Sequence, residues 1–192
     1  MFIRKKNYYL FLDNTKLFNF KLIKKNYKTT IIYRYLSNQT KEKITQLIRF
    51  RKKCRTNKIR FFIANDLNLV RKTKADGIYI SAYNKKNYKF IQKIGSAHNY
   101  KEVSMKIKQN CQTIIFSRLF MTNYKNKKNY YGIIKFNLIA KNVLKQIFPL
   151  GGIRNSNLLK LNMIQSEGFA LLSEIKKKAG CFKPAFLIII LN

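Results

Sequence analysis

Phe148-Pro149-Leu150-Gly151-Gly152-Ile153 is the stretch of this sequence that says most about the fold. Further along, Gly168-Phe169-Ala170-Leu171-Leu172-Ser173 is a second apolar run, and it opens at a glycine. This pairing is typical of the last two strands of a (β/α)₈ barrel, whose adjoining loops commonly bind a phosphate. Glycine suits such loops, because without a Cβ the backbone N–H groups can approach phosphate oxygens closely. The sequence therefore predicts an α/β fold of the TIM-barrel type with a phosphate site.

Apolar runs alternate with helical stretches about eight times along the chain, which predicts parallel strands joined by crossover helices. The expected strands are 8–12, 30–35, 59–64, 77–80, 90–94, 113–116, 146–150 and 169–172. The expected helices are 16–26, 41–56, 100–110 and 135–146, with a short helical piece between the third and fourth strands. We expect truncated helices after the third, fourth and eighth strands. An open doubly wound sheet has the same alternation, and periodicity does not separate it from the barrel.

Two of these helices depend on particular side chains. In 16–26, Leu17, Phe20 and Ile23 are spaced for one helix face and are expected in the core. In 41–56, Thr40 stands where an N-cap residue is expected.

The composition predicts one compact domain over residues 1–192 with a strong positive field. The formal charge is +34, from 41 Lys plus Arg against 7 Asp plus Glu. Such an excess fits a polyanionic partner, but a coding bias toward Lys, Asn, Ile, Tyr and Phe is the favoured explanation, although it does not easily account for the scarcity of Glu. A nucleic-acid partner is disfavoured, because the charges are scattered through nearly every expected helix and loop and no RNA-binding motif is present. Whether the positive charge reflects a partner or a coding bias, the field that it creates attracts phosphorylated ligands.

Cysteine usage and hydropathy indicate a cytoplasmic protein that does not cross a membrane. Cys54, Cys111 and Cys181 are isolated thiols without metal-ligand spacing, so we expect buried small apolar side chains in a reducing compartment. The apolar run Phe186–Leu191 is six residues long, which is too short to span a bilayer. The basic N-terminus precedes an apolar run too short for a signal sequence.

Polar residues stand at the carboxyl ends of the expected strands, where barrel enzymes place their chemistry. In chain order they are Arg34, Asn65-Asp66, Ser96-Ala97-His98, Phe120-Met121-Thr122-Asn123-Tyr124-Lys125, Gly151-Gly152-Ile153 and Leu172-Ser173. In this order and spacing the set resembles the thiamine-phosphate synthase and thiazole tautomerase family. The resemblance covers about residues 8–177 and is strongest over 30–177. Its most specific part is a series of three segments in this order. The first is Phe-x-Thr-x-x-Lys over 120–125, the second is Gly-Gly-Ile over 151–153 with Asn157 after it, and the third is Gly-Phe-Ala-Leu-Leu-Ser over 168–173.

The resemblance implies a transferase of thiamine biosynthesis that joins hydroxymethylpyrimidine diphosphate to thiazole phosphate. Pyrophosphate leaves with the help of Mg²⁺, and thiamine phosphate forms. By position, Arg34 and Lys125 would be the catalytic cations at the diphosphate, Asn65 would also hold it, and Asp66 would be the Mg²⁺ ligand. Ser96 would contact the pyrimidine. The thiazole phosphate would be held by Thr122, Gly151, Gly152, Leu172 and Ser173.

These residue types suit that chemistry. A departing diphosphate gathers negative charge, so cations and N–H donors must stand where the charge develops. Arg offers a planar fork and Lys a compact charge for the same anion. Mg²⁺ takes oxygen ligands from one or two carboxylates and from the phosphates themselves.

The sequence also departs from the family pattern. The family has the motif Gln-x-Arg-x-Lys at the second strand. This chain has Ile32-Tyr33-Arg34-Tyr35-Leu36 there, so it keeps the Arg and lacks the Gln and the Lys. The second Mg²⁺ carboxylate is replaced by Asn84, a neutral and weaker ligand. Arg118 stands where the tautomerase branch has its catalytic His, so tautomerase activity is not expected. A barrel that binds thiazole or thiamine phosphates without reaction therefore stays open as an alternative.

Several of these residues also have a plain structural interpretation. Asp66 can cap the following short helix, Asp76 can support the start of a strand, and His98 can orient its loop. Gly151-Gly152 can be a tight turn, and Lys125 can be a solvated charge. Arg34, which lies between two tyrosines, can form a surface on which bases stack.

Overall fold

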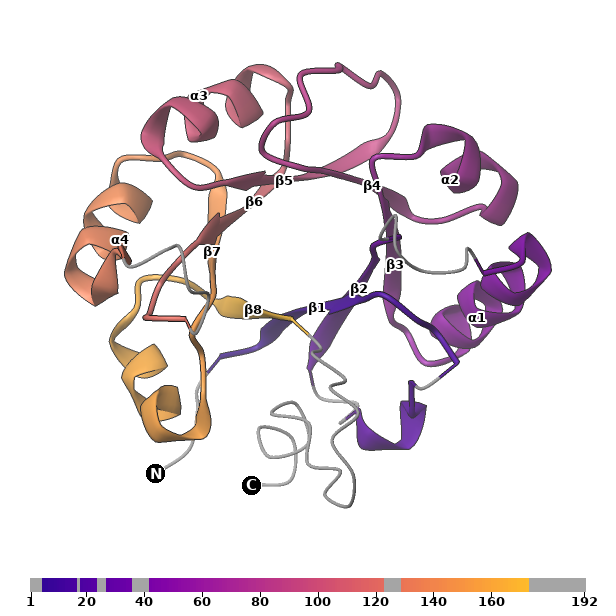
Figure 1. The fold of residues 1–192 in the computed structure, drawn as a ribbon, viewed down its shortest axis with the longest axis horizontal. Helices are drawn as coiled ribbons and strands as arrows, with labels where there is room; N and C mark the ends of the chain where they lie inside the picture. Colours follow the sequence, from indigo (N-terminus) through magenta and orange to yellow (C-terminus); the bar gives the residue numbers. More distant parts are fainter. Residues whose placement is uncertain (1–4, 17, 24–26, 36–41, 123–128, 173–192) are drawn as a thin grey trace.

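Eight parallel strands close into a barrel in which each strand pairs with the next and β8 pairs with β1 (Figure 1). The computed structural model describes residues 5–16, 18–23, 27–35, 42–122 and 129–172. The strands are β1 (Asn7–Leu12), β2 (Lys28–Tyr33), β3 (Arg60–Ala64), β4 (Gly77–Ile80), β5 (Gln92–Ala97), β6 (Thr113–Ser117), β7 (Gln146–Leu150) and β8 (Gly168–Leu172). The predicted barrel is confirmed, and the open sheet is excluded.

Helices surround the ring of strands on its outside (Figure 1). They are α1 (Ile44–Thr56), α2 (Leu67–Thr73), α3 (Tyr100–Lys108), α4 (Gly132–Lys141) and the 3₁₀ helices η1 (Phe20–Leu22) and η2 (Asn155–Met163). The expected truncation is seen at the seven-residue α2 and between β4 and β5, where residues 81–91 form no helix. The segment after β8 lies outside the described residues. Helix α4 ends at Lys141, before the predicted 146, and Leu144 beyond it is fully exposed.

Large side chains fill the barrel interior. Successive residues of a strand point to opposite faces, so one set faces the barrel axis and the other faces the helices. Two aromatic contacts cross the interior: Tyr9 with Phe148, with ring centroids 4.7 Å apart, and Phe11 with Tyr79, 5.2 Å apart. The buried interior cluster is Tyr9, Phe11, Ile32, Phe62, Tyr79, Ile94, Ile115, Phe148 and Ala170. This packed interior supports the carboxyl ends of the strands from below.

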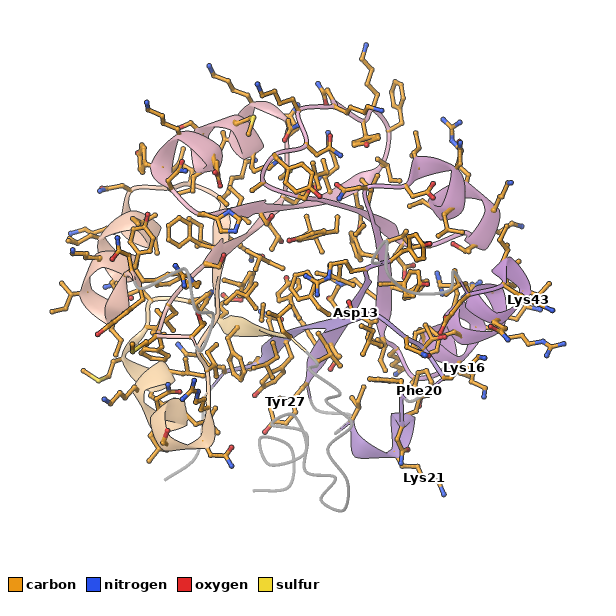
Figure 2. The ribbon with its side chains drawn as sticks, viewed as in Figure 1. Asp13, Lys16, Phe20, Lys21, Tyr27 and Lys43 are labelled. Carbon is orange, nitrogen blue, oxygen red and sulfur yellow. The ribbon has the colours of Figure 1, made fainter. Side chains whose placement is uncertain are left out.

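The helix predicted over 16–26 is wrong. In its place the described residues contain only the short turn η1, capped by the side chain of Asn19. Phe18 and Phe20 both pack against Phe50 of α1, at centroid distances of 5.7 and 5.3 Å. Residues two apart do not share a helix face, so these two contacts require a turn. Lys21 points away from the barrel (Figure 2), and Leu17 lies outside the described residues.

Helix α1 begins at Ile44, later than predicted, and the cap residue is Lys43, which makes no side-chain capping bond. Thr40, the expected cap, lies outside the described residues. Just before the helix, the buried carboxylate of Glu42 accepts hydrogen bonds from the backbone N–H and the Oγ1 of Thr15, at 2.7 and 2.6 Å. These bonds tie the start of α1 to the loop that leaves β1.

Buried polar side chains hold the β4–β5 loop where a helix is missing. Lys106 of α3 is 0% exposed, and its Nζ donates to the carbonyls of Ser81 and Asn84 at 2.7 and 2.9 Å. Gln109 adds bonds from its Nε2 to the carbonyls of Asn84 and Lys86. Burial lowers the pKa of Lys106, and its oxygen acceptors offset part of the cost of burying the charge.

Two thiols are buried and unpaired with another cysteine, as predicted. Burial raises the pKa of Cys54 to about 12 and that of Cys111 to about 11, so both stay protonated at neutral pH. Cys181 lies outside the described residues. In the described part of the chain, the helices are too short or too polar to cross a bilayer.

Asp76 joins three elements of the fold, in agreement with the structural role expected for it. Its Oδ2 accepts a hydrogen bond from the N–H of Phe61 in β3 at 2.7 Å. Its Oδ1 accepts one from Nη2 of Arg51 in α1 at 2.5 Å. Asp76 itself directly precedes β4.

We predict that Asp76→Ala lowers the free energy of unfolding by about 2 kcal/mol, because it removes the acceptor of a strand N–H and of Nη2 of the largely buried Arg51, whose Nε still donates to the carbonyl of Lys74. Asp76→Asn should cost less, because an amide oxygen can still accept from Phe61. Urea unfolding measures both, with the exposed Lys72→Ala of α2 as control. An Asp76→Ala variant as stable as this control would contradict the assignment.

Candidate active site

The carboxyl ends of the strands surround a cavity of about 1570 Å³. Every strand contributes to its lining, from Phe11 in β1 to Leu172 in β8. This is the face on which barrel enzymes carry their active sites. The cavity exceeds the range of roughly 300–1,000 Å³ that is usual for one small-molecule site.

Most of the residues predicted from the sequence line this one cavity. They are Arg34, Asn65, Asp66, Ser96, Thr122, Gly151 and Leu172. Gly152 is not part of the lining and directly follows Gly151. Lys125 and Ser173 lie outside the described residues, as does Leu36.

Arg34 stands at the carboxyl end of β2 and pairs with a carboxylate that sequence analysis did not identify. Its Nε lies 3.2 Å from Oδ1 of Asp13, and its Nη2 lies 3.5 Å from Oδ2. Asp13, labelled in Figure 2, directly follows β1. The guanidinium carbon lies 5.9 Å from the ring centroid of Phe11, within cation–π range. These two contacts fix the direction of the guanidinium.

Asn65 organises the loop that follows β4. Its backbone adopts a left-handed conformation with φ of 56°, and its N–H donates to the carbonyl of Tyr79. Its Oδ1 accepts from the N–H and the Oγ of Ser81 at 3.0 and 3.1 Å, and from Nδ2 of Asn84 at 2.9 Å. The oxygen is therefore committed to the loop, and the amide nitrogen of Asn65, which carries the N–H donors, is the group that suits a phosphate.

Asp66 caps helix α2, as its structural interpretation predicted. Its Oδ1 accepts a hydrogen bond from the N–H of Leu69 at 2.8 Å. The same side chain also lines the cavity, so capping sets the orientation of the carboxylate at the rim. Within the described residues, no group of three or more His, Cys, Asp or Glu side chains could hold a metal ion.

Asn84 is turned into its own loop and is not part of the cavity lining. Its Nδ2 donates to Oδ1 of Asn65 and, at 3.3 Å, to the hydroxyl of Tyr88, while its Oδ1 accepts from the N–H of Lys86. The carbonyl of Asn84 accepts from the buried Lys106. The loop thus uses both ends of this amide for its own structure.

Tyr79 is a site residue to which sequence analysis gave no role. It lines the cavity and hydrogen-bonds to Ser96. Burial raises the pKa of Tyr79 to about 12, although the Ser96 bond and the charge of Arg34 act in the other direction. The phenol therefore stays protonated at neutral pH. Tyr79 lies within the strand expected over 77–80, but its pairing with Ser96 of β5 depends on the register between the two strands.

Gly151 and Gly152 form a tight loop against the segment that follows β6. Both have positive φ, 98° and 69°, and a Cβ on Gly152 would overlap the carbonyl oxygens of Phe120 and Met121. Asn157 holds the loop by donating from Nδ2 to the carbonyl of Gly152 at 2.8 Å. Glycine is therefore required here by backbone conformation and by close packing.

Cations predominate among the charged side chains that line the cavity. In the described part of the chain they are Arg34, Arg118 and Lys135, against the single carboxylate of Asp66. His98 also contributes to the lining. Its Nδ1 lies 3.0 Å from Oε2 of Glu102, and its carbonyl accepts from the hydroxyl of Tyr131. His98 is thus part of the loop structure. Because cations outnumber carboxylates in the lining, the cavity is suited to anionic ligands.

Comparison with known proteins shows the family to which the chain belongs. The chain matches the thiamine monophosphate synthase family over residues 19–175. It is 23% identical over 166 residues to a thiamine-phosphate synthase of Prochlorococcus marinus (strain AS9601), a match that covers 83% of this chain and 47% of the relative. The chain thus spans about half the length of the curated relatives it matches.

Solved structures show the same fold. A thiamine phosphate pyrophosphorylase from Pyrococcus furiosus superposes with a TM-score of 0.68 at 16% identity, with 98% of each chain covered. A thiamine phosphate pyrophosphorylase from Bacteroides thetaiotaomicron gives a TM-score of 0.62 at 16% identity, over 96% of this chain and 93% of that one. The resemblance seen in the sequence is confirmed: the chain belongs to the thiamine monophosphate synthase family.

Proposed function

We propose that this barrel joins hydroxymethylpyrimidine diphosphate to thiazole phosphate and releases pyrophosphate and thiamine phosphate. The observation that carries the proposal is a single cation-rich cavity at the carboxyl ends of the strands, lined by most of the residues that the family pattern assigns to the two substrates. Its volume, about 1570 Å³, leaves room for two small phosphorylated molecules together. The reducing cytoplasm inferred from the scattered cysteines is where we place this reaction.

In this proposal each group has a defined task. Arg34 and Lys125 neutralise the diphosphate as its C–O bond to the pyrimidine methylene breaks. Ser96, with Tyr79 bonded to it, orients the pyrimidine ring. The Gly151-Gly152 loop with Thr122, Leu172 and Ser173 holds the thiazole phosphate.

The residues present fit a magnesium ion held through one protein carboxylate. Asp66 lines the cavity, whereas the amide oxygens of Asn65 and Asn84 already accept hydrogen bonds within the loops. Mg²⁺ is commonly bound through one or two carboxylates together with substrate phosphates. When bound, the ion would neutralise charge on the diphosphate oxygens.

A second candidate function is phosphate binding without reaction, and the position of Asn84 favours it. A carboxylate at this position would be the second magnesium ligand of the family pattern, but here a neutral side chain serves its own loop. Calorimetry with thiazole phosphate and thiamine phosphate, beside a product assay with both precursors and Mg²⁺, separates the two. Product formation supports the synthase, and binding without product selects the alternative.

We predict that Arg34→Ala and Lys125→Ala each lower kcat by about 10²–10³-fold, because each removes a cation from the developing diphosphate charge. Both variants should keep the circular dichroism spectrum of the parent. The matched control is Lys108→Ala, which removes an exposed charge from the outer helix α3. Parent-like turnover in either site variant would remove that residue from the catalytic set.

We predict that Asn84→Asp alone does not raise turnover. The new carboxylate would face Oδ1 of Asn65 where the Nδ2 donor stood, so acceptor would meet acceptor and stability should fall by about 1 kcal/mol. Turnover measured against Mg²⁺ concentration and urea unfolding check both parts. A higher kcat at lower Mg²⁺ would show instead that residue 84 can reach the metal.

A further inference from the structure

Arg118 introduces a cation directly after β6, where the tautomerase branch of the family has its catalytic His. We propose that Arg118 binds the monoester phosphate of the thiazole substrate, together with Gly151 and Thr122. This assignment deepens the proposed function and rests on it. It gives the cavity a second anion site, apart from the one at Arg34.

Contacts hold Arg118 against the two residues that are expected at this phosphate. Its Nη1 donates to Oγ1 of Thr122 at 3.1 Å. Its aliphatic stem packs on Gly151, because a Cβ added there would lie 3.1 Å from Cγ and 3.2 Å from Cβ of Arg118. The guanidinium therefore stands between the β7 loop and the segment after β6, inside the cavity lining.

The backbone around Arg118 is fixed on both sides. Its carbonyl accepts from the N–H of Tyr131, at the start of α4, at 3.0 Å. The next two residues, Leu119 and Phe120, donate to the carbonyls of Leu150 and Gly151 at 2.9 and 3.0 Å. A side chain on such a support is positioned before a ligand arrives, which reduces the entropy lost on binding.

The chemistry of the guanidinium suits a phosphate monoester. It carries five N–H donors in a planar fork and accepts no hydrogen bond, so its polar partners are oxygen acceptors such as those of a phosphate. The same fork matches two phosphate oxygens at once, and such charge-assisted bonds are roughly twice as strong as neutral ones.

The two arginines stand on opposite sides of the barrel. In the closed order of eight strands, β2 with Arg34 and β6 with Arg118 are four strands apart in either direction, and Figure 1 shows them across the ring from each other. Lys135 of α4 lines the cavity as well and follows β6 in the chain. Two separated cationic sites match two substrates that each carry their own phosphate group.

The test is calorimetric titration of thiazole phosphate and of the unphosphorylated thiazole alcohol into the parent chain and into Arg118→Met. Methionine keeps an aliphatic stem against Gly151 and removes the charge. We expect the phosphate ester to bind about 10–100-fold more weakly to Arg118→Met, and the alcohol to bind with unchanged affinity. The matched control is Arg49→Ala, which removes an exposed arginine from the outer helix α1 and should bind both ligands like the parent.

The outcomes separate this assignment from the function on which it rests. If the parent binds neither thiazole, the proposed function fails and the assignment with it. If the parent binds the ester and Arg118→Met binds it equally well, only the assignment is overturned. A loss of affinity for both ligands also overturns it, because that result indicates disturbed packing. Should Arg118→Met not fold, Arg118→Gln and Arg118→Lys replace it, and lysine should restore part of the affinity for the ester.

Discussion

The pairing of β8 with β1 is the interaction on which the rest of the molecule depends, because it closes the sheet. Five residue pairs join the two strands, beginning with Asn7 and Gly168. A Cβ at Gly168 would overlap the carbonyl oxygen of Asn7, so the strands can meet here only through a glycine. Closure removes both sheet edges and brings all eight carboxyl ends to one rim. Arg34, Asp66 and Gly151 share a cavity for this reason, although they are far apart in the sequence.

Loops around that rim are held by specific polar contacts in places where longer helices are absent. Glu42 ties the start of α1 to the β1 loop, and Asn65 joins the β3 and β4 loops through one amide oxygen. Lys106 and Gln109 fix the β4–β5 loop from outside the barrel. Hydrogen bonds therefore hold the β3–β4 side of the site in place, and the same bonds engage both ends of the Asn84 amide.

Strand periodicity predicted the alternation of eight strands, because it is a local signal, but it did not separate a barrel from an open sheet. The glycine loops and the family resemblance favoured the barrel, and the resemblance led to most of the site residues that line the cavity. The sequence failed over 16–26, where the spacing of Leu17, Phe20 and Ile23 fits a helix. There the contact of both Phe18 and Phe20 with Phe50 overrides the spacing. Asp13 beside Arg34, and Tyr79 beside Ser96, could not be predicted as pairs. Each pair joins different strands, and strand register decides such contacts.

Lys106 has a consequence for how this lysine-rich sequence can change over time. Exposed lysines on the outer helices can be exchanged for arginine at little cost, because solvent accommodates either head group. At position 106 the ammonium is fully enclosed and reaches two carbonyls of the β4–β5 loop and the side-chain oxygen of Gln109. A guanidinium is larger and planar, and it would displace those oxygens. Sequence drift that is neutral across most of the surface is therefore constrained at Lys106, since it supports a wall of the cavity.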